Sequence, residues 1–200
     1  MSSPFGVGNA HFRTGQKEGP VDTVAFGMYK KAVFGKAGIF DETFIRNQDD
    51  EFNYRVLKSG YRIILSNKVR VRYHVRSSWK KLFRQYYQYG YWKVFVNRKH
   101  HTITTLRQLI PAGFILFLAA GVFLSFFSFS ILALYLSALA LYGLTAITEA
   151  ARREALKDIF PQCGIFITLH LSYGMGYWEG LIRFLILRQQ PAADRTTLSR

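Results

Sequence analysis

Three consecutive carboxylates, Asp49, Asp50 and Glu51, are the residues of this sequence best suited to chemistry. An ionised carboxylate held in a fixed place can accept the proton of a hydroxyl group while that hydroxyl attacks an electrophilic carbon. The cluster has a second interpretation, because acids in the first turn of a helix are favoured by the helix dipole, and Asn47 is a suitable N-cap. The residues by themselves leave both interpretations open.

A helix over residues 46–58, ended by Gly60, is expected to position these acids. Upstream, residues 21–29 are predicted to form a short buried strand, and residues 30–38 a brief helix that ends at a glycine. The glycine-rich residues 1–20 are typical of an irregular loop. This part of the chain is therefore α/β in character.

Residues 61–65 and 69–74 alternate apolar and basic side chains, which predicts a hairpin-like pair of strands. Ser77 or Ser78 is then expected to cap a helix. Apolar side chains recur at helical spacing on one of its faces, at Trp79, Leu82, Phe83 and Tyr86. The other face carries Lys80, Lys81, Arg84 and Gln88. An aromatic face beside a basic face suits a membrane interface.

Charge divides the chain near residue 108. The first 108 residues hold 20 of the 27 lysines and arginines but only 7 of the 12 acids. Residues 68–107 contain eleven basic side chains and no carboxylate, and the uncharged residues 110–147 follow almost at once. A basic block beside an apolar stretch predicts an anionic bilayer surface as partner, and no nucleic acid.

Residues 109–127 and 130–147 are each long enough to cross a hydrocarbon core of roughly 30 Å, and they predict a transmembrane hairpin with a short turn at Ser128. A third apolar segment, residues 165–187, contains polar side chains that are costly in lipid: His170, Glu179 and Arg183. It either spans the membrane with these groups facing other helices, which we favour, or lies at the interface. Gly174, Gly176 and Gly180 predict a smooth face for close helix packing.

A series of short motifs surrounds the carboxylates: GIFDE at 38–42, QDDE at 48–51, Arg55, and GYRII at 60–64. Their order and spacing resemble the C-terminal half of a GT-A family 2 glycosyltransferase. More narrowly, four segments look like the succinoglycan-type exopolysaccharide glycosyltransferases. They are GVGNAHFR, VDTVAFG, RNQDDEFNYR and RQYYQYGYWK.

The resemblance implies an α/β fold, the C-terminal portion of a GT-A nucleotide-diphospho-sugar transferase domain, followed by a transmembrane α-helical region. We expect that portion at residues 1–76 and interfacial amphipathic helices at 77–108. A transmembrane region at 109–187 and a polar tail at 188–200 follow. Because no signal sequence follows Met1, the protein is expected at the inner membrane with its soluble part in the cytoplasm.

The resemblance also implies inverting sugar transfer from a nucleotide-sugar donor to a lipid-linked or polysaccharide acceptor. It puts Asp49 at the position of the general base, with Asp50 as the fallback and Glu51 as the second acid. The implied substrate-binding residues are Gly27, Asp41, Glu42, Arg55, Arg84, Gln85, Gln88, Tyr89 and Gly90. Gln88 and Tyr89 stand where related enzymes carry the Arg-Trp of a Q-x-x-R-W motif, so the charge for a diphosphate would have to come from Arg84 or Lys93.

The donor half of such an enzyme lies outside this pattern. No Asp-x-Asp precedes Asp49, so the divalent cation (Mg or Mn) that the family implies would take its ligands elsewhere, and a separate N-terminal catalytic half is an expected partner. The alternative is a non-catalytic basic membrane-anchored module, or an inactive remnant, that binds anionic lipid or polymer.

Histidine and cysteine give no sign of a metal site. Four of the five histidines, His11, His74, His100 and His101, lack ligand spacing with acids or cysteine, and we leave them out of the site. The single cysteine, Cys163, can form no internal disulfide and is expected to pack in an apolar run.

Overall fold

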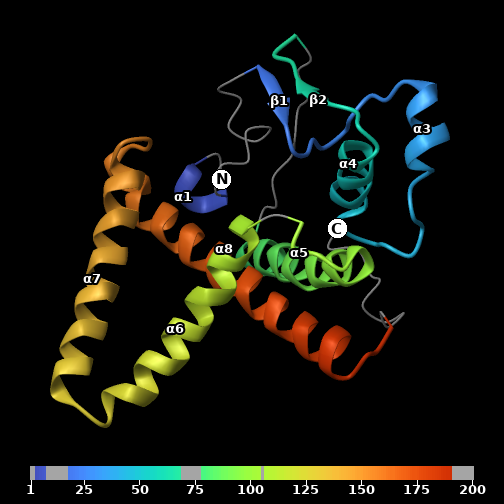
Figure 1. Ribbon diagram of the computed structural model, residues 1–200. Coiled ribbons are helices and arrows are strands. Elements are labelled where there is room, and N and C mark those ends of the chain that lie inside the picture. Colours follow the sequence, from blue (N-terminus) through green and yellow to red (C-terminus); the bar gives the residue numbers. More distant parts are fainter. Residues whose placement is uncertain (1–2, 8–17, 69–77, 105, 191–200) are drawn as a thin grey trace.

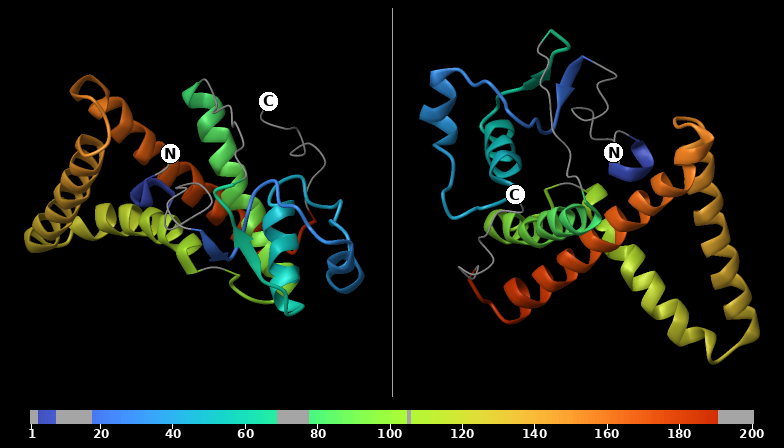
Figure 2. Two further views of the ribbon diagram at one scale, coloured as in Figure 1. Left: turned by 90° about the horizontal axis from the view of Figure 1, so that it is seen from above. Right: turned by 180° about the vertical axis from the view of Figure 1, so that it is seen from behind.

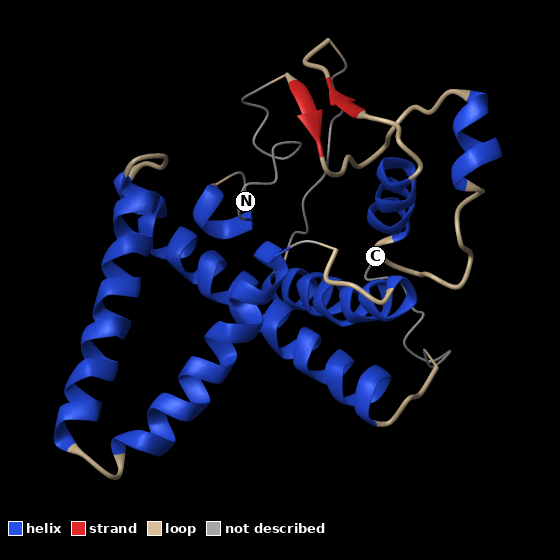
Figure 3. Ribbon diagram, viewed as in Figure 1, coloured by secondary structure: helices blue, strands red, loops and turns tan. Residues whose placement is uncertain are grey.

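The structure, a computed structural model, describes residues 3–7, 18–68, 78–104 and 106–190 (Figure 1). The strand expected at 69–74, most of the GVGNAHFR motif and the last ten residues lie outside this part of the chain, as do His11 and His74. Helices make up most of the described residues, and the only strands among them are one short pair (Figure 3). This short strand pair is the only β structure among the described residues that corresponds to the expected α/β fold.

The strand pair joins β1 (Gly19–Val21) to β2 (Ile63–Leu65) in an antiparallel register that sets Pro20 opposite Ile64. The strand predicted at 21–29 is therefore wrong, because β1 ends where that strand was to begin. Phe26 adopts a positive φ of 58°, which is costly for a bulky side chain and incompatible with a strand. Residues 61–65 do contain a strand, but β1 is its partner.

The helix α4 (Gln48–Lys58) packs against β2, and α3 (Lys31–Ala37), ended by Gly38 at a φ of 76°, packs against α4. Both match the sequence expectation. Phe52 of α4 is fully buried, and it contacts the rings of Tyr29, Phe34 and Phe40. Burying one such side chain stabilises the fold by about 2–3 kcal/mol, so the apolar face of α4 is the core of this layer.

The long helix α5 (Trp79–His100) begins at Ser78, whose hydroxyl accepts a hydrogen bond from the Lys81 amide, as expected for an N-cap. Its buried faces differ from the amphipathic prediction. Leu82 is buried, whereas Trp79 is 51 % exposed, and Gln88, expected on the outer polar face, is 9 % exposed. The reason is that α5 lies between two partners, α4 and α8, and has polar side chains on the α4 side.

The most extensive helix contact joins α5 to α8 (Ile159–Gly180), which continues into a π-helical turn, Leu181–Ile186 (Figure 2). Glycines permit the close approach. A Cβ at Gly176 would overlap the carbonyl oxygen of Tyr87, and a Cβ at Gly180 would lie 2.9 Å from the Tyr91 carbonyl oxygen. The predicted smooth glycine face is thus confirmed.

Two helices, α6 (Leu109–Ser125) and α7 (Phe129–Ala151), form a hairpin that projects away from α3 and α4, with α5 and α8 between (Figures 1 and 2). With the turn Leu106–Gln108, α6 is 20 residues long and α7 is 23, and both are apolar enough to cross a membrane. Most of their large apolar side chains are exposed. The predicted hairpin, with Ser128 just before α7, is therefore present.

The third apolar segment does not share this composition: α8 is not among the described helices apolar enough to cross a membrane. Its polar side chains face other helices. His170 lies 2.8 Å from the Tyr142 hydroxyl of α7, and Glu179 accepts from the Tyr87 hydroxyl of α5 and from Arg183. The costly groups of this segment are thus satisfied inside the protein.

A short helix near the start of the chain, α1 (Pro4–Val7), packs on α7 and α8. The Ser3 hydroxyl donates to Glu149, and the Phe5 carbonyl oxygen lies 2.8 Å from His170 Nε2. Cys163 packs in the same cluster, beside Phe166, as a small apolar side chain. The first residues of the described chain are therefore anchored on α7 and α8.

Candidate functional site

The first turn of α4 and the residues just before it face α5, and polar contacts join the two. The turn before α4 bends sharply, because Asn47 adopts a left-handed conformation with a φ of 61°. Asn47 occupies the N-cap position but its side chain makes no capping bond; its Nδ2 donates to the Tyr89 carbonyl oxygen of α5 at 3.1 Å. Asn47 is therefore at the predicted N-cap position, but its side chain joins α4 to α5 instead of capping the helix.

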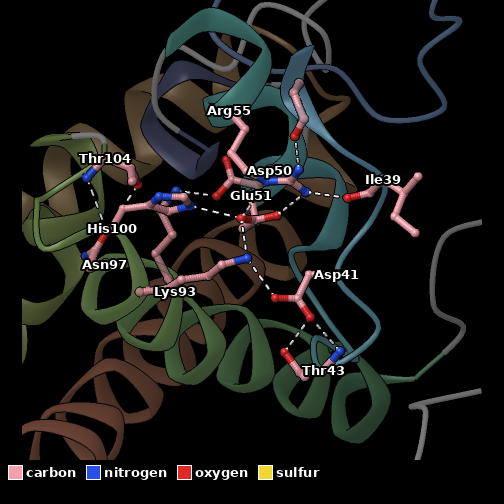
Figure 4. Close-up of polar contacts among 12 residues, drawn as sticks. Ile39, Asp41, Thr43, Asp50, Glu51, Arg55, Lys93, Asn97, His100 and Thr104 are labelled. Atoms are coloured by element: carbon pink, nitrogen blue, oxygen red, sulfur yellow. Dashed lines mark hydrogen bonds and ion pairs between the residues drawn. The ribbon is translucent and has the colours of Figure 1, made fainter. Parts of the chain in front are cut away.

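Glu51 is the centre of the contact between the helices and has no exposed surface. Its carboxylate accepts from Arg55 Nε and Nη2 at 2.9 Å each and from Lys99 Nζ at 2.7 Å, and His100 Nε2 lies 2.9 Å away (Figure 4). Burial by itself would raise the pKa of Glu51, but the bonds from Arg55 and Lys99 outweigh it and lower that pKa. Glu51 is therefore ionised and held by three side chains.

Arg55 and Asp41 extend this cluster to the turn before α4. Arg55 Nη2 donates to the Ile39 carbonyl oxygen at 2.8 Å, and Nη1 donates to the Ala37 carbonyl oxygen. Asp41 accepts from Lys99 at 2.7 Å and from the amide and hydroxyl of Thr43. Burial opposes ionisation of Asp41, but these donors prevail and lower its pKa to about 2. Both residues thus position the turn that precedes the acids.

Asp50 points toward α5, where it is ion-paired with the buried Lys93 (Figure 4). The Asp50 side chain keeps 24 % of its surface exposed, against 7 % for Lys93. Lys93 was one of two residues expected to supply charge to a diphosphate. The structure instead places its ammonium group on a carboxylate of the same protein.

Asp49 occupies a third side of α4, because successive residues of a helix are about 100° apart. It is half-buried, and its Oδ1 accepts from the Asp50 amide at 2.9 Å. Burial chiefly raises the pKa of Tyr29, and the negative charge of Asp49 raises it further, against a hydrogen bond to Asn53 that lowers it. Asp49 and Glu51 therefore lie on different sides of α4.

The sequence-predicted residues of α5 lie along its packed faces. Gln85 and Gln88 are buried; Gln85 Nε2 donates to the Tyr89 hydroxyl at 2.8 Å, and Gln88 Oε1 accepts from Arg46 Nε at 3.2 Å. Gly90 faces α8, where a Cβ would overlap the Tyr173 carbonyl oxygen. The structure thus brings Gln85, Gln88 and Tyr89 together and gives Gly90 a packing role.

Three further residues were expected to bind substrate: Arg84, Glu42 and Gly27. Arg84 and Glu42 are exposed. A Cβ at Gly27 would lie 2.6 Å from the Tyr29 hydroxyl oxygen, so the glycine leaves space for the tyrosine ring beside α4. None of these observations places a ligand on these residues.

Sequence reasoning missed three members of the site: Arg46, Lys99 and His100. The lack of metal-ligand spacing at His100 says nothing about an ion pair with a distant acid. A usable signal existed in the spacing from Lys93 to His100, seven residues or two helical turns, which sets both on the face of α5 that meets α4. Burial lowers the pKa of His100 more than the neighbouring Glu51 raises it, so the imidazole is neutral and can donate from Nε2.

The described residues do not offer a metal site. No three side chains of histidine, cysteine, aspartate or glutamate gather there. The best-placed carboxylates, Asp50 and Glu51, accept from lysine and arginine, and this cationic surrounding opposes a divalent cation. The cation implied by the resemblance therefore does not fit the residues described.

Comparison with known proteins confirms the resemblance. The chain is 27 % identical over 185 residues, 92 % of its length, to the succinoglycan biosynthesis protein ExoA of Rhizobium meliloti. It is 28 % identical over 163 residues, 81 % of its length, to the dolichyl N-acetyl-alpha-D-glucosaminyl phosphate 3-beta-D-2,3-diacetamido-2,3-dideoxy-beta-D-glucuronosyltransferase of Methanococcus voltae.

The chain spans about half the length of these relatives, 55 % of the first and 48 % of the second. No protein-family model matches the sequence. No solved structure matches it either.

Proposed function

We propose that this chain is the acceptor-side and membrane half of an inverting glycosyltransferase that builds exopolysaccharide or a related glycolipid. The names of the two relatives support a sugar transferase of this kind. The transferred sugar would come from a nucleotide-sugar donor bound by a separate upstream half, and any divalent cation on the donor would take its ligands there. The acceptor is lipid-linked or a growing polysaccharide at the cytoplasmic face of the inner membrane.

The observation that carries this proposal is the different surroundings of three adjacent carboxylates. Glu51 has no exposed surface and accepts from three side chains, so it cannot reach a substrate hydroxyl. Asp50 is ion-paired with the buried ammonium group of Lys93, so its carboxylate already serves a contact between α4 and α5. Asp49 lies on another side of α4 and stands at the base position that the resemblance implies, so we take it as the general base.

In the proposed reaction Asp49 accepts the proton of the acceptor hydroxyl as that oxygen attacks the anomeric carbon of the donor sugar. The bond from the anomeric carbon to the diphosphate oxygen breaks, and the nucleoside diphosphate leaves with the electron pair. Attack from the side opposite the leaving group inverts the anomeric configuration. Glu51, Asp41 and Arg55 do not touch substrate in this scheme, and they hold the turn and the start of α4 in place.

The competing proposal is a non-catalytic module that binds anionic lipid or polymer. What favours it is the exposed basic side chains near the start of α5, Lys80, Lys81 and Arg84, on the helix that leads into the apolar hairpin. Such binding depends on charge and is weakened by salt.

A transfer assay separates the two proposals. The chain is joined to the upstream half of the succinoglycan relative, and labelled sugar from a nucleotide donor is followed into the lipid fraction. We expect labelled product from the joined protein and about 100- to 10,000-fold slower labelling with the Asp49→Asn variant. Salt-sensitive vesicle binding that is identical for both proteins, without any product, would instead favour the binding module.

A further inference from the structure

The position of α8 relative to the membrane follows from its contacts with the hairpin of α6 and α7. These two are the described helices that are long and apolar enough to cross a membrane. The short turn between them puts the start of α6 and the end of α7 on the same side of the membrane, which we call the near face. A residue of α8 that contacts either helix therefore lies at the depth of that contact.

The first half of α8 descends beside α7. Phe166 packs with Ala146 and Ala150, close to the end of α7. His170 lies 2.8 Å from the hydroxyl of Tyr142, which is further from the near face. A helix that crosses the membrane would continue along α7 toward the turn of the hairpin.

The second half of α8 instead returns to the start of α6. A Cβ at Gly174 would overlap the Pro111 carbonyl oxygen, and Trp178 Nε1 donates to the Ala112 carbonyl oxygen at 2.9 Å. Pro111 and Ala112 belong to the first turn of α6, next to the near face. From Ile159 to Trp178 the helix is about 28 Å long, close to the thickness of a hydrocarbon core of roughly 30 Å. It covers this length and is again beside the near face.

Beyond the hairpin, the chain follows α5 and not the membrane. Phe184 in the π-helical turn contacts the rings of Tyr91 and Phe95, and Arg98 donates to the Gln189 carbonyl oxygen at 2.8 Å. The helix α5 carries six lysines and arginines, which are costly in hydrocarbon, and its polar side is bound to α4. The end of α8 is therefore held on the side where α4 lies.

The exposed side of α8 is apolar. Phe160, Ile167, Met175 and Ile182 are between 43 % and 81 % exposed. They recur at intervals of seven or eight residues, which places them on one side of the helix. An apolar stripe opposite a packed side suits the boundary between headgroups and acyl chains.

We propose that α8 is an interfacial helix, which lies across the near face of the membrane with this apolar stripe against the lipid. The crossing helices of the described chain are then α6 and α7, and both ends of α8 are on the side of the candidate site. This position differs from the favoured expectation that residues 165–187 span the membrane. It does not depend on the proposed sugar transfer.

Side-specific labelling tests where the two ends of α8 lie. In a Cys163→Ala background, single cysteines are introduced at exposed residues: Lys157→Cys before α8, Gln190→Cys after it, and Phe126→Cys at the turn of the hairpin. The full chain in bacterial inner membranes, prepared as right-side-out or inverted vesicles, is treated with a membrane-impermeant maleimide. We expect Lys157→Cys and Gln190→Cys to be labelled from one face and Phe126→Cys from the other.

Spin labels test whether the stripe keeps a constant depth. Nitroxides attached in Phe160→Cys and Ile182→Cys report depth through their collisions with oxygen and with a water-soluble nickel complex. The two positions are about 33 Å apart along the helix, but we expect both nitroxides about 5–10 Å below the headgroup boundary. The matched pair is Leu134→Cys and Leu144→Cys, both exposed on α7, whose depths should differ by about 15 Å.

Several results would overturn the proposal. Labelling of Gln190→Cys from the face opposite Lys157→Cys would show that α8 crosses the membrane, as would a difference in depth between Phe160→Cys and Ile182→Cys like that of the α7 pair. Nitroxides on the stripe that meet water alone, or neither quencher, would show that it does not lie against lipid. Labelling of Phe126→Cys from the same face as Lys157→Cys, or from neither face, would remove the crossing hairpin. A joined protein that transfers no sugar would leave all these results standing.

Discussion

Replacing Gly90 with alanine tests the crossing of α5 and α8, on which the position of the site depends. A Cβ at this residue would overlap the Tyr173 carbonyl oxygen and lie 2.9 Å from the Tyr177 amide nitrogen. The helices would have to separate by roughly 1.4 Å to restore ordinary contacts of about 3.5 Å. Overpacking of this kind costs about 3 kcal/mol at its upper end, and the better helix propensity of alanine returns about 1 kcal/mol.

The expected net destabilisation is about 2 kcal/mol, which for a chain of this size lowers Tm by roughly 4–8 °C. Thermal unfolding in detergent, followed by circular dichroism, measures it. The matched control is Gly143→Ala in α7, where a Cβ would meet no atom within 4 Å, so its Tm should be unchanged or higher. A Gly90→Ala protein that melts with wild type but no longer transfers sugar would refute the packing role and restore Gly90 to the substrate site.

Two further predictions concern the residues that hold α4. Acidification should destabilise the fold in two steps. Folding lowers the pKa of His100, so the unfolded chain binds a proton more readily, and Tm should begin to fall below about pH 6.5. Glu51 and Asp41, whose pKa values are lowered on folding, should add a further loss from about pH 4 downward; a Tm independent of pH from 7 to 3 would contradict both steps. Asn53→Ala should cost about 3 kcal/mol in chemical unfolding, because it leaves the buried partners Thr23, Val24 and Tyr29 without a hydrogen bond. Asn67→Ala, at an exposed residue, should cost little, and equal losses for the two variants would show that the buried contacts are not responsible.

Periodic and terminal signals predicted most helices well. The cap at Ser78, the glycine that ends α3 and the uninterrupted apolar runs of α6 and α7 are local properties, and the structure has them where the sequence indicates. The glycines of α8 also predicted close helix packing, but they did not indicate that α5 would be the partner helix.

Pairing between distant segments could not be predicted in the same way. β2 pairs with β1, 44 residues earlier by the Pro20–Ile64 register, and the apolar run at 21–29 follows the strand instead of forming it. The order of the acids along the sequence predicted a site. Only the structure shows that Asp50 and Glu51 form ion pairs with lysines of α5. Those contacts depend on α5 reaching back across about 40 residues, which no local pattern encodes.

The most direct test of the account is the turnover number of the Asp49→Asn variant in the joined protein, beside Asp50→Asn. A general base of this kind contributes about 100- to 10,000-fold, so we predict a loss of that size for Asp49→Asn with the KM for the donor unchanged. Asp50→Asn should lose less, because its carboxylate serves the pair with Lys93. Transfer by Asp49→Asn at close to the wild-type rate, whatever the effect of Asp50→Asn, would contradict the account.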